Sequence, residues 1–176
     1  MNSMSIPRVA DASACGCRKE KEQTAAVLLK CKTGFPLTIT EDVTTGTTFN
    51  LNTLSLNLEK FKNPCIKFEF AANIITAVTS VTLSFQIFKQ CRNQTTPTPI
   101  GPAWVYDVGI GDGVTVSGTD AFTFIVCDCE CDNDSCFDEC CTYTVVVTAV
   151  STEAGTTIIN NPTFSALVVD NNCHCR

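Results

Sequence analysis

The sequence predicts an all-β protein, a β-sandwich or jelly roll of about eight strands behind a flexible N-terminal arm. Thr, Val and Ile dominate the chain after the first 23 residues, and β-branched side chains favour sheets. Apolar and polar side chains alternate in several short segments, whereas helical periodicity is almost absent. Turn residues separate these segments at short intervals, as they do in sandwiches.

The arm and the domain differ in pattern. Residues 1–23 are polar, end in a run of alternating charges, and show neither helical nor strand periodicity. Residues 24–176 carry the strand signals and form the predicted jelly-roll domain. A chain of 176 residues suits one domain with an ordinary hydrophobic core.

Four strands are predicted in the first half of the chain. Residues 25–31 and 37–40 are short segments rich in apolar and β-branched residues. Residues 49–58 alternate first on one face and then on the other, which predicts a β-bulge near residues 52–53. The clearest alternation covers residues 66–70, where Lys and Glu separate three apolar side chains.

Five strands are predicted in the second half. Residues 81–87 have the same strict alternation, and residues 105–108 form a shorter candidate. Residues 122–126 and 143–147 flank a segment rich in cysteine, and residues 164–169 close the domain. The predicted turns lie at residues 45–46, 63–64, 97–102, 109–113, 153–155 and 160–162.

Cysteine is the most unusual component of the chain. There are 13 cysteines, against one His and one Trp. A domain of this length folds without covalent help, so this density indicates an oxidised destination or a bound metal. Because an internal disulfide uses two cysteines, the odd total requires at least one free thiol or one symmetric inter-chain pair.

Charge and hydropathy exclude two classes of partner. The net charge is −6, and the 12 Lys and Arg residues are spread thinly, which argues against nucleic acid and against polybasic membrane attachment. No apolar run is long enough to span a bilayer, and the N-terminus lacks the apolar core of a signal peptide. We therefore expect either a signal that has been removed or release by another route, such as lysis.

Enzymatic activity is not expected. His174 is the single histidine and lies near the end of the sequence, where it cannot easily be held against a buried nucleophile. No G-x-S-x-G, H-E-x-x-H or phosphate-binding motif occurs, and the glycines of residues 109–113 lack the Lys and helix of a phosphate loop.

The densest motif is a loop with its strand ends, in which six cysteines fall within fifteen residues. A thiolate cluster for Zn or another soft metal is one interpretation, but the spacings lack the usual C-x₂₋₄-C knuckle. Local disulfides that staple a long hairpin loop are favoured, and mostly free thiols are the third alternative. The intra-domain disulfide candidates are Cys127, Cys129, Cys131, Cys136, Cys140 and Cys141.

Carboxylates alternate with these cysteines. Counted from Asp128, acidic residues fall at positions one, three, five, seven and twelve, as in a Ca²⁺-binding loop. However, the flanks have strand periodicity instead of helical periodicity, and cysteines interrupt the ligands. A solvated acidic loop is therefore favoured, and we expect no metal and no cofactor.

Two C-x-C motifs flank the predicted domain, Cys15-Gly16-Cys17 on the arm and Cys173-His174-Cys175 near the end of the sequence. A thiol on the arm has no role in folding, and an extended arm of this length reaches about 75 Å, far enough to meet another subunit. The placement suggests inter-subunit disulfides. Bonds back to the same domain, or chelation of a metal, are the alternatives.

Cys31, Cys65 and Cys91 are isolated in the sequence. Cys31 lies in the first predicted strand, and the other two lie at strand ends. Each is either a buried apolar thiol or an accessible partner for an arm cysteine.

Three functions compete at this point. The arm, the terminal C-x-C pairs and the lack of catalytic residues favour a self-assembling structural protein. The cysteine-rich loop suggests a surface or coat module that binds Zn or Ca as the alternative. A carbohydrate-binding sandwich is less favoured, since its exposed aromatic candidates are only Trp104 and Tyr106.

Several segments together carry a family resemblance: the Cys15-Gly16-Cys17 arm, and residues 63–70, 83–91, 122–129, 140–147 and 164–169. In composition and order they resemble the endospore appendage subunits, the Ena-type pilins of spore-forming Bacillota and their clostridial relatives. The resemblance spans most of the chain.

The resemblance implies a jelly-roll β-sandwich domain with an N-terminal connector arm. It also implies a structural subunit that self-assembles into a durable fibre (pilus or appendage) on the endospore surface. Subunits would join as a ring or helical filament through edge strands that extend a sheet, and through disulfides from the arm of a neighbour. Cys15 and Cys17 would be the donors, and Cys31 with Cys173 or Cys175 the acceptors. A minor anchoring subunit is an open question.

The resemblance also implies a location. Such subunits are made in the mother cell without a signal peptide and displayed on the spore surface, outside the cell, after lysis. That route would reconcile abundant cysteine with an N-terminus that lacks a signal.

Overall fold

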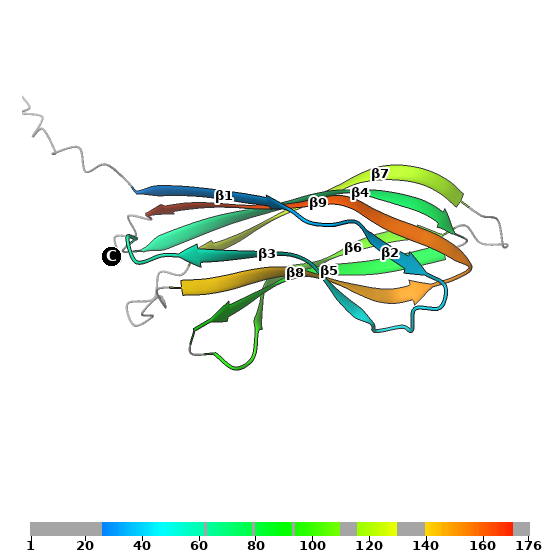
Figure 1. Ribbon diagram of the computed structural model, residues 1–176, viewed down its shortest axis with the longest axis horizontal. Helices are drawn as coiled ribbons and strands as arrows, with labels where there is room; N and C mark the ends of the chain where they lie inside the picture. Colours follow the sequence, from blue (N-terminus) through cyan, green and yellow to red (C-terminus); the bar gives the residue numbers. More distant parts are fainter. Residues whose placement is uncertain are drawn as a thin grey trace, which may run out of the picture.

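The chain forms a β-sandwich of two antiparallel sheets that pack face to face (Figure 1). The computed structural model describes residues 26–61, 63–78, 80–92, 94–109, 116–129 and 140–170. These residues form β1 (Val27–Thr33), β2 (Leu37–Thr40), β3 (Thr48–Asn57), β4 (Pro64–Val78), β5 (Ser80–Cys91), β6 (Thr98–Gly109), β7 (Val116–Cys129), β8 (Cys140–Thr152) and β9 (Gly155–Asp170). The described residues contain no helix, so none offers a helical membrane span. The predicted fold class is confirmed.

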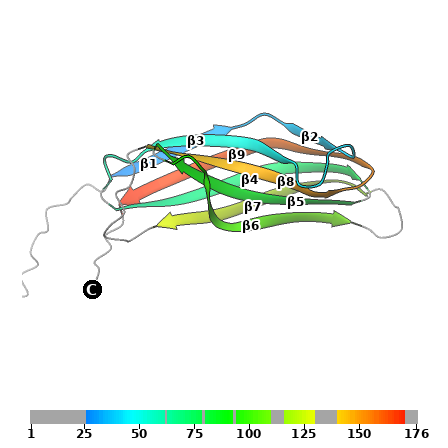
Figure 2. The same ribbon diagram turned by 90° about the horizontal axis from the view of Figure 1, so that it is seen from below.

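The strand order is that of a jelly roll. Sheet A runs β1–β9–β4–β7. Strand β1 pairs with residues 163–169 of β9, and β2 pairs with residues 156–159 of the same strand. Sheet B runs β3–β8–β5–β6. Apart from the consecutive strands β5 and β6, neighbours within each sheet come from distant parts of the chain, which is the pattern produced by two interleaved Greek keys. Figure 2 shows β6 and β7 along one long edge of the sandwich, with β1, β2 and β3 along the other.

The core lies between the sheets and follows the alternation seen in the sequence. In β4, Ile66, Phe68 and Phe70 are fully buried, while the intervening Lys and Glu face solvent. The ring centroid of Phe70 lies 5.8 Å from that of Phe85 in sheet B and 5.2 Å from that of Phe124 in β7. Aromatic contacts of this kind bury a large apolar area and hold the two sheets together.

Two segments predicted as turns lie inside strands instead. Residues 160–162 belong to β9, where Asn161 adopts φ 51° and the pairing with β4 shifts. Most of residues 97–102 belongs to β6, where Gly101 adopts φ 65° and the pairing with β5 shifts. The residues that usually make turns form β-bulges here, and β6 tolerates prolines because it is an edge strand.

The bulge predicted near residues 52–53 is confirmed. The pairing of β3 with β8 skips Leu51, and both Leu51 and Asn52 are buried. The side-chain amide of Asn52 donates to the carbonyl oxygens of Lys32 (2.7 Å) and Pro162 (3.1 Å). The bulge thus turns a polar side chain inward, where it links sheet B to sheet A.

Gly155 provides a test of this packing. It begins β9 at φ 131°, and an added Cβ would overlap the carbonyl oxygen of Ala77 in β4. Gly155→Ala should lower the free energy of unfolding by about 2–3 kcal/mol, because strain and overlap coincide. Gly46 also has a positive φ, 88°, but nothing lies within 4 Å of its added Cβ.

Gly46→Ala is therefore the matched control, with an expected loss of only about 1 kcal/mol from backbone strain. Urea unfolding followed by Trp104 fluorescence measures both losses. Equal losses for the two variants would show that β9 shifts freely at Gly155.

Candidate functional site

Most cysteines of the described residues gather at one end of the sandwich, called here the cysteine end. Strands β4 and β8 begin at this end, and β5 and β7 finish there. The jelly-roll order therefore brings together residues that are far apart in sequence. The cysteines are Cys65, Cys91, Cys127, Cys129, Cys140 and Cys141.

Two disulfides staple the cysteine end, one within each sheet. Cys65 of β4 bonds to Cys129 of β7, with their Cα atoms 4.2 Å apart. Cys91 of β5 bonds to Cys141 of β8, with their Cα atoms 4.1 Å apart. In each case the two residues lie directly opposite one another in the strand pairing. Each bond therefore cross-links neighbouring strands.

These pairings differ from the disulfides local to the loop that the sequence favours. Cys129 and Cys141 are bonded within the domain, but each partner comes from another strand. Cys127 and Cys140 are free, exposed thiols, which corrects the prediction that they form intra-domain disulfides. A bond inside the loop is ruled out for Cys129 and Cys141 because β4 and β5 already supply their partners.

The loop's other two candidates, Cys131 and Cys136, lie outside the described residues. The two disulfides nonetheless bracket that segment. One fixes the residue before it to sheet A, and the other fixes a residue just after it to sheet B.

The isolated cysteines have different fates. Cys65 and Cys91 are neither buried thiols nor open acceptors, since both are in disulfides. Cys31 is a free, exposed thiol on the edge strand β1, so it is not a buried thiol. The terminal candidates Cys15, Cys17, Cys173 and Cys175 lie outside the described residues, as does the arm, so their roles stay predictions.

A buried ion pair lies beside the disulfides. Lys89 of β5 donates from Nζ to Oδ2 of Asp128 in β7 at 3.2 Å, and the two side chains are 12% and 7% exposed. The pair spans the core from one sheet to the other. Asp128 is the first position of the Ca²⁺-like ladder, and a lysine already holds its carboxylate.

The rest of the carboxylate ladder lies within residues 130–139, outside the described ranges. Where side chains are described, no three His, Cys, Asp or Glu residues converge as metal ligands would.

The two candidate sugar-binding aromatics pack onto the protein itself. The Tyr106 hydroxyl donates to Oδ2 of Asp120 at 2.7 Å, and its ring is 8% exposed. Burial first, and then the hydrogen bond and charge of Asp120, raise the pKa of Tyr106. Trp104 stacks on Phe124 with ring centroids 5.8 Å apart and is 37% exposed. Neither ring forms a free platform.

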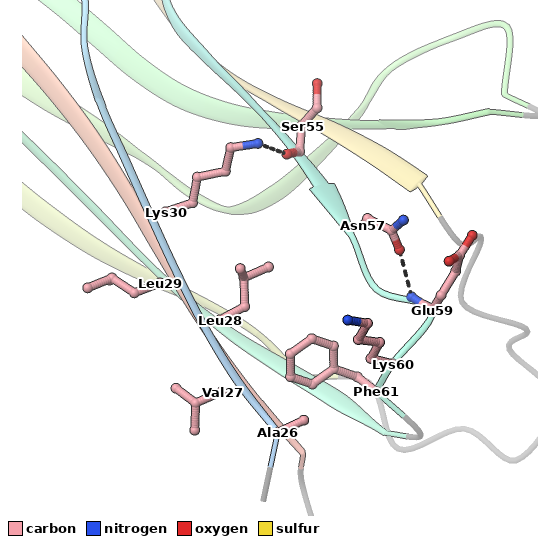
Figure 3. A pocket seen from close by; sticks show the side chains of 10 residues that line it. All are labelled: Ala26, Val27, Leu28, Leu29, Lys30, Ser55, Asn57, Glu59, Lys60 and Phe61. Carbon is pink, nitrogen blue, oxygen red and sulfur yellow. Dashed lines mark hydrogen bonds between the residues drawn. The ribbon is translucent and has the colours of Figure 1, made fainter.

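A groove of about 630 Å³ opens between β1 and the end of β3 (Figure 3). Leu28 and Phe61 point into it, whereas Val27 and Leu29 point away from it. At its upper end Nζ of Lys30 donates to the carbonyl oxygen of Ser55 in β3. This lysine occupies a backbone acceptor on the outer edge of sheet B.

Comparisons with known proteins give a family and a fold. The family described as "Domain of unknown function (DUF4489)" matches residues 25–169. No curated protein matches the sequence significantly. A solved structure of infectious bursal disease virus, Gx strain, aligns with TM-score 0.50 and 12% identity over 85% of this chain and 33% of the viral one.

Two further structures are more distant. The VP2 subviral particle of the same virus aligns with TM-score 0.42 and 10% identity over 81% of this chain and 36% of that one. The Eiger TNF protein of S. frugiperda aligns with TM-score 0.36 and 6% identity over 82% of this chain and 99% of that one. This chain spans about a third of the viral chains that it resembles. At these identities the likeness establishes the sandwich fold alone.

Proposed function

This chain belongs to the DUF4489 family, and we propose that it is a structural subunit without catalytic activity. In this proposal, copies self-assemble by β-sheet augmentation and inter-subunit disulfides into a durable fibre, a pilus or appendage of the endospore surface. The subunit is made in the mother cell, and the fibre is displayed after lysis.

The free thiols carry the proposal. Cys31, Cys127 and Cys140 are exposed, and the two disulfides at the cysteine end already staple both sheets. Three surface thiols contribute little to folding, and exposed cysteine is a liability in a protein that stays monomeric. In an oxidising environment outside the cell, such thiols form bonds between chains.

The edges of the sandwich supply the second support. Sheet A has β7 at one edge and β1 with β2 at the other, and sheet B has β6 and β3. Edge strands present backbone donors and acceptors that can pair with another chain. The two sets of edges lie on opposite long sides (Figure 2), so one copy can follow another without closing the chain of contacts.

Two lysine side chains occupy backbone carbonyl oxygens along part of the β3 edge. Nζ of Lys30 donates to the Ser55 carbonyl oxygen at 2.6 Å, and Nζ of Lys32 donates to the Thr53 carbonyl oxygen at 3.4 Å. Lysine at an edge opposes unregulated pairing. Augmentation that uses β3 requires these side chains to move.

The fold likeness gives weaker support. The matched viral structure shares this sandwich at 12% identity, and sandwiches of this type are common in proteins that build coats. The predicted arm would add the reach needed to join copies that are not edge neighbours.

The experiment is negative-stain electron microscopy of the oxidised full-length protein, with and without reductant, alongside non-reducing gels. We expect filaments or stacked rings and a ladder of covalent species that reductant collapses. Cys15→Ser with Cys17→Ser should retain the monomer's melting temperature but lose most of the ladder. Small isolated particles without a ladder in the oxidised sample would exclude a self-assembling subunit.

A further inference from the structure

The outer face of sheet A carries an apolar patch at the cysteine end. The pairing sets Val27 opposite Val169, and Leu29 opposite Leu167. All four side chains face away from the core, because the residues between them point inward. Figure 3 shows Val27 and Leu29 directed away from the groove. These four residues are called here the outer patch.

The outer patch is unusually exposed for its composition. Val27 is 62% exposed, Leu29 71% and Leu167 39%. Ile125 of β7, on the same face, adds another apolar side chain at 49% exposure. The exposed Lys67–Glu69 pair of β4 separates Ile125 from Leu167, so the contiguous apolar surface is the outer patch on β1 and β9. Exposed apolar surface of this kind marks a docking site for another chain.

Free thiols lie on the two edge strands of the face that carries the outer patch. Cys31 lies on β1 in the row Cys31–Ser165–Glu69–Ile125, as the strand pairings align it. Cys127 lies on β7, two residues beyond Ile125, and is directly opposite Lys67. Both thiols lie at outward-facing positions of their strands and are exposed. Thus one face presents a thiol on each edge strand, with the outer patch on β1 and β9 and the exposed Lys67–Glu69 pair on β4 between them.

The spacing of the two thiols is set by the sheet. Three strand spacings of about 4.8 Å and an offset of two residues place their Cα atoms about 16 Å apart. An extended Cys-Gly-Cys segment spans about 7 Å between its Cα atoms. Each disulfide adds about 5.5–6.8 Å between Cα atoms, so one such segment can bond to both thiols.

We propose that this face binds residues 1–17 of a second copy, with Cys31 and Cys127 as the two acceptors for its Cys15 and Cys17. The inference rests on the proposed self-assembly and specifies its covalent site. It differs from the resemblance, which points to Cys173 or Cys175 as the second acceptor. The strand β7 therefore supplies a bond that the sequence pattern did not indicate.

The composition of residues 1–17 suits the outer patch. Met4, Ile6 and Val9 precede the two cysteines and provide apolar side chains for Leu29 and Leu167. Burial of these side chains would bring the arm thiols to the face before any bond forms. Docking then raises the effective concentration of each thiol pair.

The covalent step needs a two-electron oxidant, and a small-molecule disulfide of the glutathione class suffices. The thiolate of Cys127 attacks that disulfide, forms a mixed disulfide and releases one small thiol. The arm thiolate then attacks the sulfur of Cys127, forms the inter-chain bond and releases the second small thiol. Each thiolate arises by loss of one proton, and each inter-chain bond reduces one small-molecule disulfide to two thiols.

The test mixes two full-length variants. A donor chain carries Cys31→Ser and Cys127→Ser, and a size-tagged acceptor chain carries Cys15→Ser and Cys17→Ser. In oxidised glutathione buffer, we expect a covalent heterodimer whose linked peptides join the arm to both Cys31 and Cys127. An acceptor that also carries Cys127→Ser should lose the Cys127 link and retain the Cys31 link, whereas added Cys140→Ser should change neither.

Three outcomes would overturn the inference. Links from the arm to Cys173 or Cys175, with an unchanged yield when Cys127 is removed, would assign the second acceptor elsewhere. Arm links within a single wild-type chain would make the face a site for the chain's own arm. If no covalent heterodimer forms, the face does not accept the arm of a second copy. If filaments still form in these cases, the proposed function stands and only its covalent site is wrong.

A second measurement tests the outer patch without touching a thiol. Leu29→Gln with Leu167→Gln should slow heterodimer formation about tenfold or more, because two exposed leucines lose their apolar contact with the arm. Val150, on sheet B, is 44% exposed. Val150→Gln is the control and should leave the rate unchanged. Equal rates for the two acceptors would show that the outer patch does not bind the arm.

Discussion

Removal of the Cys91–Cys141 disulfide should lower the free energy of unfolding by about 4 kcal/mol, within the usual range of about 2–5. The bond closes a chain segment with a sequence separation of 50 residues, so it restricts the unfolded chain strongly. Both sulfurs are buried, at 6% and 1% exposure for the two residues. Cys91→Ala with Cys141→Ala therefore also removes buried apolar contacts.

Cys140→Ala is the matched control for this loss. Cys140 is adjacent in sequence but exposed and free, so we expect a change within about 0.5 kcal/mol. Urea unfolding of the monomer without reductant measures both variants. If the double variant unfolds like the wild type, the bond adds nothing to stability and only blocks two thiols.

Lys89→Met should destabilise the domain by about 3–5 kcal/mol, since it leaves the buried carboxylate of Asp128 without its cation. The two groups are 3.2 Å apart, nearly buried, and join opposite sheets. Replacement of both, as Lys89→Met with Asp128→Leu, should restore most of the loss, because apolar residues of similar size can substitute for a buried pair. A double-mutant cycle from urea unfolding gives the coupling free energy.

The solvent-exposed pair Lys67 and Glu69 is the control for this cycle. Their charged atoms are 3.9 Å apart, and the side chains are 47% and 54% exposed. Lys67→Met should therefore change stability by less than about 1 kcal/mol. A loss of that small size for Lys89→Met as well would indicate that water reaches Asp128 in solution.

Much of the fold follows from the sequence because each strand of a sandwich has one buried face and one solvent-exposed face. The alternation in β4 is strict, so its strand and its buried side are readable directly. The bulge in β3 is readable for the same reason, since an extra residue reverses the alternation. Residues 160–162 were predicted wrongly because Asn-Asn-Pro suits a turn and a bulge equally well. Only the long-range pairing with β4 decides between them.

The disulfide pairing could not be predicted from local sequence patterns, for a different reason. Cys65 and Cys129 are separated by 64 residues, and no local pattern links them. Their pairing depends on β4 and β7 being neighbours, which the jelly-roll order specifies but alternation does not. Application of that order to the predicted strands would have placed all four bonded cysteines at matching strand ends. The free thiols follow by the same argument, because Cys127 is paired with Lys67 and Cys140 with Asn57, so neither lies opposite another cysteine.

The position of β9 has a consequence for the timing of synthesis. It is the last strand in chain order, yet it lies between β4 and the pair β1 and β2 in sheet A. A nascent chain therefore cannot complete sheet A until residues 155–170 have left the ribosome, whereas its arm emerges first. Leu167 and Val169 belong to β9, so the proposed acceptor face forms only after β9 has been synthesised. In the proposed assembly, chains that still lack β9 would carry arms but no face to dock them, and this order would delay cross-linking until β9 has joined sheet A.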